Sequence, residues 1–139
     1  QQRRTAIAGV LAMRPKYLVL DEPTAGLDPS ARNKILDEIY KLYKKVEDLT
    51  VILVSHSMED IAKYANRLIV IDKGEIVMDG SPEDVFSKPE LLKDIGLGVP
   101  QITEFMYANR KRGNDINDRI LNVNDGYSEM KRFLGEKDG

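Results

Sequence analysis

Two short apolar segments, each followed at once by polar residues, constrain the fold of this chain most strongly. The first is residues 17–20 (YLVL), closed by Asp21 and Glu22, and the second is residues 50–54 (TVILV), closed two residues later by His56. Continuous apolar runs of this length are typical of strands buried on both faces of a parallel sheet. We therefore predict two parallel strands whose carboxyl ends bring Asp21 and His56 to the same edge of a sheet.

Helical patterns alternate with these strands. Residues 24–29 have turn chemistry, and Ser30 is a candidate cap for a long helix. One face of that helix is apolar, with Ile35, Leu36, Ile39, Leu42, Tyr43 and Val46. A short helix is expected over 58–64, and a hairpin over 67–71 and 75–78 has a glycine in its turn. The order strand, helix, strand, helix, hairpin predicts a layered α/β architecture.

Further helices are expected before the first strand and after the hairpin. Residues 3–13 predict a mostly apolar helix that Pro15 ends, and the first residue is Gln1 rather than methionine. A start inside a helical pattern suggests a piece of a longer protein. Residues 81–84 form a helix start with a cap, a proline and early acids. Two further helices are expected near 102–107 and over 127–134, separated by the polar residues 113–126.

Composition excludes several classes of protein. The 139 residues are 42% hydrophobic and 32% charged, as in ordinary soluble, folded chains. A net charge of −2 argues against a nucleic-acid binder held by bulk electrostatics. The sequence has no cysteine, so it can form neither a disulfide nor a thiolate metal site. Its longest apolar runs are too short to span a bilayer.

Asp21 and Glu22 are the first candidates for chemistry. Adjacent residues on a strand point to opposite sides, so one carboxylate could hold magnesium while the other orients and deprotonates a water. Nucleotide hydrolysis needs this division of labour. His56, the only histidine, could hydrogen-bond a terminal phosphate from the same edge. The plain alternatives are that the acids merely end a strand and that the histidine is an ordinary surface residue.

Together these segments resemble the ATP-binding-cassette ATPases. Residues 18–23 look like the Walker B strand, 25–29 resemble the D-loop and 54–56 resemble the switch-histidine loop. Residues 1–9 are similar to the helix after the family's signature motif, and Gln1 aligns with the last residue of that motif. The ordered set of motifs is highly specific and extends over the first 82 residues.

The resemblance implies roles for single residues. Asp21 would help to hold Mg²⁺, Glu22 would be the general base, and His56 would contact the γ-phosphate of ATP. Asp28 would communicate across a head-to-tail dimer in which each ATP lies between two subunits, and Gln1 would belong to the signature side of that nucleotide site. For Asp28 the plain reading is that it starts the turn before a helix.

The same resemblance implies the domain organisation. The fold would be a partial layered domain of the P-loop NTPase type, with parallel strands, helices and a β-hairpin. Residues 1–88 would be the part of the nucleotide-binding domain after the signature motif, and 89–139 a mostly helical C-terminal segment that could take part in dimerisation. The sequence contains no Gly-x-x-x-x-Gly-Lys-Ser/Thr motif and no Q-loop, so we expect little or no ATPase activity from these residues alone.

The C-terminal half resembles one branch of the family. Residues 91–97 and 99–104 look like the energy-coupling-factor ATPases, which power uptake of cobalt, nickel or vitamins. The expected partners are a second ATPase subunit and integral membrane subunits at the cytoplasmic face of the membrane, with no nucleic acid. The solute is not set by these residues, because a separate membrane protein binds it in that group. The alternatives are a non-transport ATPase acting on nucleic acid or ribosomes, and a non-catalytic dimerisation module.

Overall fold

The computed structural model describes Gly9 and residues 15–135. The chain forms two compact units, divided between His56 and Ser57, and each is described here by itself. Gln1 and, apart from Gly9, the helix expected over 3–13 lie outside the described residues.

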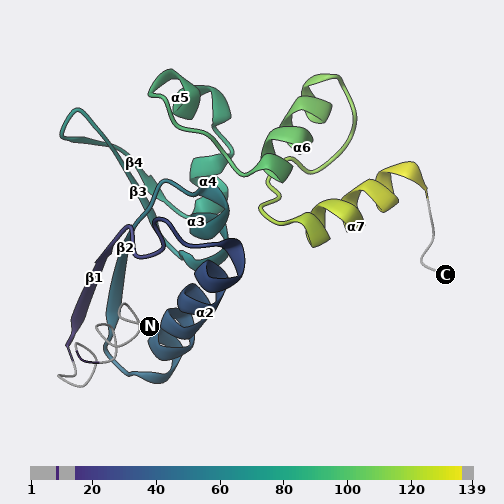
Figure 1. Cartoon of the computed structure of the whole chain (residues 1–139). Coiled ribbons are helices and arrows are strands. Elements are labelled where there is room, and N and C mark those ends of the chain that lie inside the picture. Colours follow the sequence, from purple (N-terminus) through teal and green to yellow (C-terminus); the bar gives the residue numbers. More distant parts are fainter. Residues whose placement is uncertain (1–8, 10–14, 136–139) are drawn as a thin grey trace. The chain divides into compact units, whose positions relative to one another are not determined.

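The described residues of the first unit form two parallel strands and a long helix between them in the chain. Strand β1 (Tyr17–Asp21) pairs with β2 (Thr50–Val54) in a register that runs from Tyr17 opposite Thr50 to Asp21 opposite Val54. Helix α2 (Pro29–Lys45) lies between them in the chain and beside them in space (Figure 1). The predicted parallel pairing is confirmed, so the carboxyl ends of the two strands lie side by side.

Strand β1 is buried on one face only. Leu18 and Leu20 of β1 are 5% and 9% exposed, but Tyr17 and Val19 are 71% and 62% exposed. The expectation of burial on both faces was therefore wrong for β1. Burial on both faces needs a covering layer on each side of the sheet. Among the described residues of this unit, the long helix α2 has the buried residues Ile35, Leu36 and Ile39.

The second unit contains a hairpin and five helices among its described residues. Its elements are α3 (Met58–Tyr64), β3 (Leu68–Asp72), β4 (Glu75–Gly80), α4 (Pro82–Phe86), α5 (Pro89–Asp94), α6 (Gln101–Lys111) and α7 (Val123–Leu134). Strands β3 and β4 are antiparallel, as predicted. Lys73 and Gly74 in the turn have φ of 50° and 83°, the left-handed conformations that tight hairpins require.

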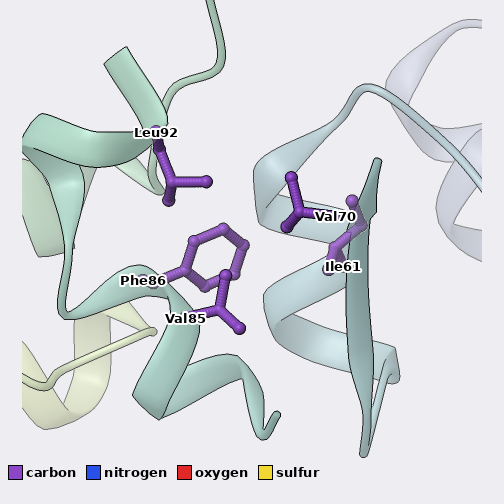
Figure 2. Packing of buried hydrophobic residues seen from close by; sticks show 5 residues of the cluster. All are labelled: Ile61, Val70, Val85, Phe86 and Leu92. Carbon is purple, nitrogen blue, oxygen red and sulfur yellow. The ribbon is translucent and has the colours of Figure 1, made fainter. Parts of the chain in front are cut away.

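Two hydrophobic clusters hold the second unit together. In the larger one, Phe86 and Val85 of α4 lie with Leu92 of α5 opposite Ile61 of α3 and Val70 of β3 (Figure 2). All five side chains are buried, with at most 8% exposure, so the cluster joins the hairpin to three helices.

The smaller cluster lies in the C-terminal segment and is built from Met106, Ile116 and Ile120, which are 0%, 1% and 6% exposed. Ile102 and Met130 pack against it, so α6 and α7 share this core. The stretch 113–126, expected to be merely polar, thus supplies two of its three buried anchors. The α/β fold with a helical C-terminal segment is confirmed. No helix in the part of the chain that the structure describes is both long and apolar enough to cross a bilayer.

Candidate functional site at the strand ends

The candidate site lies where β1 and β2 end. The backbone N–H of Glu22 donates to the carbonyl oxygen of Val54 at 3.0 Å, which extends the pairing by one residue beyond β1. Two residues after Val54, His56 Nδ1 lies 2.7 Å from Glu22 Oε1. The structure therefore places the predicted acid and the predicted histidine not merely at one edge but in direct contact.

The contact is accessible to solvent. The Glu22 side chain is 31% exposed and the His56 side chain is 83% exposed. Asp21, the last residue of β1, is also exposed. The contact engages the Nδ1 atom of His56. The Nε2 atom of the ring is the one that a ligand could meet.

Glu22 has an unusual backbone conformation. Its φ is 43°, in the left-handed region that residues with a side chain rarely adopt. Two backbone hydrogen bonds hold it there: its N–H donates to Val54, and its carbonyl oxygen accepts from the Ala25 N–H at 3.1 Å. Because β1 ends at Asp21, strand alternation does not set the direction of Glu22, and the argument that placed the two carboxylates on opposite faces does not apply to it.

The loop after Glu22 ends in the cap of α2. Asp28 Oδ1 accepts from the backbone N–H groups of Ser30 and Ala31 at 3.0 Å and 3.1 Å. Asp28 is thus the N-cap, and the expectation that Ser30 caps the helix was wrong. The reason is that Pro29 takes the first helical position, which its fixed φ favours and where no N–H is needed. This geometry gives Asp28 a structural role, which is the plain alternative weighed for it.

The donor chemistry near Asp21 fits a magnesium ion that arrives with a nucleotide. Mg²⁺ is usually held by one or two carboxylates, with phosphate oxygens and waters completing its shell. Asp21 and Glu22 provide carboxylates at the strand ends, yet the described residues include no group of three or more His, Cys, Asp or Glu able to hold a metal by themselves. Gln1, the remaining predicted site residue, lies outside the described residues.

The shared edge of the sheet could be predicted from the sequence, because residues that follow two paired parallel strands of equal length lie side by side. The direct contact between Glu22 and His56 was not predicted. The left-handed backbone of Glu22 was not predicted either, since glycine, asparagine or aspartate would be the usual choice at a positive φ.

One family model matches the first part of the chain. The family described as "AAA domain, putative AbiEii toxin, Type IV TA system" matches residues 2–60. That region contains both strands, the loop with Glu22 and the residue His56.

Individual relatives match almost the whole chain. The chain is 46% identical over 137 residues to the energy-coupling factor transporter ATP-binding protein EcfA2 of Clostridium tetani, with 99% of this chain and 47% of the relative covered. It is 52% identical to EcfA2 of Clostridium perfringens strain 13, with coverage of 98% and 46%. The chain thus spans a little under half the length of these relatives.

A solved structure agrees with these relatives. The structure of cbiO1 from Clostridium perfringens, described as part of the ABC transporter complex cbiONQ, matches with a TM-score of 0.57 and 37% identity. The match covers 74% of this chain and 41% of that one. The similarity of this chain to ATP-binding proteins of energy-coupling factor ABC transporters is therefore confirmed over nearly its whole length.

Proposed function

We propose that these residues belong to the ATP-hydrolysing subunit of an energy-coupling factor importer and supply the acid–histidine half of its nucleotide site. The 2.7 Å contact between Glu22 and His56 at the ends of two parallel strands carries the proposal. Similarity to transporter ATP-binding proteins at 46% to 53% identity supports the transport context.

The positions of the side chains support the proposed division of roles. Asp21, exposed at the last residue of β1, would help to hold magnesium, and the ion would neutralise phosphate charge. Glu22 would orient and deprotonate the attacking water. His56 would contact the terminal phosphate through Nε2, because Nδ1 is already engaged with Glu22.

The remaining parts of the proposal concern the whole protein. Its solute would be a cobalt or nickel ion or a vitamin, recognised by a separate membrane subunit. It would sit at the cytoplasmic face of the membrane, paired with a second ATPase subunit and docked on integral membrane subunits. Residues 1–88 would be the part of the nucleotide-binding domain after the signature motif, and residues 89–139 a helical C-terminal segment that could take part in pairing of the two ATPases.

These residues alone are proposed to hydrolyse no ATP. The 139-residue sequence contains no Gly-x-x-x-x-Gly-Lys-Ser/Thr loop, and hydrolysis needs backbone N–H groups around the phosphates as well as a base. Asp28 would keep its capping role, and any contact it makes across a dimer would be additional to that role.

Magnesium-dependent ATP hydrolysis by the full-length protein tests the central claim. Glu22→Gln is expected to lower turnover by at least about 100-fold with ATP still bound, because an amide cannot accept the proton of the attacking water. Glu47→Gln, at an exposed site in the connection between α2 and β2, is the matched control and should leave turnover unchanged. Full turnover with Glu22→Gln would refute the role of Glu22.

A separate experiment tests the transport context. The full-length protein is expected to co-purify with integral membrane proteins. Retention of RNA or DNA in place of membrane proteins would favour the alternative of a non-transport ATPase.

A further inference from the structure

No side chain at the N-cap position of helix α6 accepts a hydrogen bond from its first turn. Its N-cap residue is Pro100, which provides no side-chain hydrogen bond to the first turn. The first N–H groups of any helix lack partners within the helix and carry a partial positive charge. Glu59 of α3 provides the missing acceptor: its Oε1 accepts from the backbone N–H of Gln101 at 3.4 Å.

Glu59 lies close in the chain to the candidate nucleotide site. It is the second residue of α3, and Ser57, the residue directly after His56, is the N-cap of that helix. The Ser57 hydroxyl accepts from the Asp60 N–H at 3.3 Å. Ser57, the N-cap of α3, is therefore the residue that links His56 in the chain to the first turn of α3.

Apolar packing joins α3 to the same part of the C-terminal segment. Ile61 of α3 is buried in the larger hydrophobic cluster, and Val99, two residues before α6, packs against that cluster. Leu121, which precedes α7, packs there as well. Helices α6 and α7 share the core around Met106, so a displacement of the start of α6 would carry both helices.

We propose that Glu59 is a positioning residue that holds the first turn of α6 to α3, so that the C-terminal helices follow the state of the loop carrying His56. The inference rests on the proposed role of His56 in the nucleotide site. It gives the Glu59 carboxylate a regulatory function: nucleotide bound at the strand ends changes the start of α6. By linkage, perturbing this contact changes the response to nucleotide.

Hydrogen exchange in the full-length protein tests this inference. With Glu22→Gln to prevent turnover, amide exchange is followed by mass spectrometry in peptides covering residues 97–106, with and without magnesium ATP, and ATP binding is measured separately. Without ATP, Glu59→Ala is expected to speed exchange of the Gln101 amide by about threefold to tenfold, the effect of losing one hydrogen bond.

The decisive readout is the effect of ATP on that exchange. The ATP-dependent change should persist with Glu59→Gln, which retains an acceptor oxygen, and disappear with Glu59→Ala although ATP still binds. Glu104→Ala, which removes an exposed carboxylate from the same turn of α6 itself, is the matched control and should retain the change. If ATP binds but exchange at α6 does not respond, or responds equally with Glu59→Ala, the inference is overturned. If no ATP binds, the proposed function fails and this inference fails with it.

Discussion

The carboxylate of Glu129 on α7 should stabilise the C-terminal segment in a strongly pH-dependent way. Arg132, one turn later, donates to it from Nε at 2.8 Å and from Nη2 at 2.7 Å. The backbone N–H of Asn117 donates to the same carboxylate, and Arg132 also donates to the carbonyl oxygen of Asp115 at 2.9 Å. Glu129 and Arg132 thus hold residues 115–117, which include the buried Ile116, against α7.

These hydrogen bonds favour the ionised carboxylate. The Arg132 guanidinium, followed by the Asn117 N–H, lowers the pKa of Glu129 from 4.5 to about 2. A folded-state pKa below the unfolded value means that the stabilisation is fully present above pH 4.5 and is lost as the pH falls toward 2. A full shift of this size corresponds to about 3 kcal/mol. Because Arg132 is 57% exposed, solvent screening reduces the expected contribution to about 1 kcal/mol.

Urea unfolding followed by far-UV circular dichroism can measure this contribution. Glu129→Gln is expected to lower the free energy of unfolding by about 1 kcal/mol at pH 6, and about half of that difference should vanish by pH 3. Glu104→Gln, at an exposed position on α6, is the control and should change little at either pH. An equal loss at pH 6 and pH 3 would refute the reasoning, since an ionised carboxylate would then not be the source of the stability.

Two further substitutions test the packing and the helix cap. Met106→Ala should lower the free energy of unfolding, measured in urea, by about 2 to 5 kcal/mol, because Met106 is completely buried. Phe105→Ala, at a 49% exposed site, should lower it by less than about 1 kcal/mol. Similar losses for the two variants would contradict the assigned core. Asp28→Ala should lower the free energy of unfolding by about 1 kcal/mol. Asp28→Asn can still accept hydrogen bonds from the first turn of α2, so it should lower this free energy by only about a few tenths of a kcal/mol. An equal loss for the two variants would argue against the capping role.

Much of the fold could be predicted because local signals and tertiary structure agree. The two apolar runs became β1 and β2, and Ser81 caps α4 at the place that its sequence indicates. The hairpin follows from a glycine at a position that requires positive φ. In these segments propensity, capping and burial favour the same structure.

The errors arose where burial depends on distant partners. Residues 113–126 look polar, and Ile116 and Ile120 lie in a part of this stretch that forms neither helix nor strand, so their burial depends on tertiary packing and not on a local period. Helix α5 (Pro89–Asp94) was not foreseen, because a six-residue segment offers little periodicity. The one-sided burial of β1 could not be read from its sequence either, since an apolar run predicts burial but not which covering layers are present.

The site was predictable in its composition but not in its detailed geometry. Residue order and strand pairing bring Asp21, Glu22 and His56 to one edge, and sequence conveys both. The Glu59 contact with α6 could not be foreseen, because residues 59 and 101 are joined only through tertiary packing.

The left-handed backbone of Glu22 is best understood together with its contact to His56. A residue with a side chain at a φ of 43° is strained by roughly 1 kcal/mol, which the hydrogen bonds to Val54 and Ala25 offset. Glycine would remove the strain at no cost to either backbone bond, yet it would also remove the carboxylate. Strain of this kind persists where the surrounding structure holds it and clusters at functional sites. The conformation turns the chain at the strand end while keeping the Glu22 carboxylate within 2.7 Å of His56, which is the arrangement that the proposed hydrolysis needs.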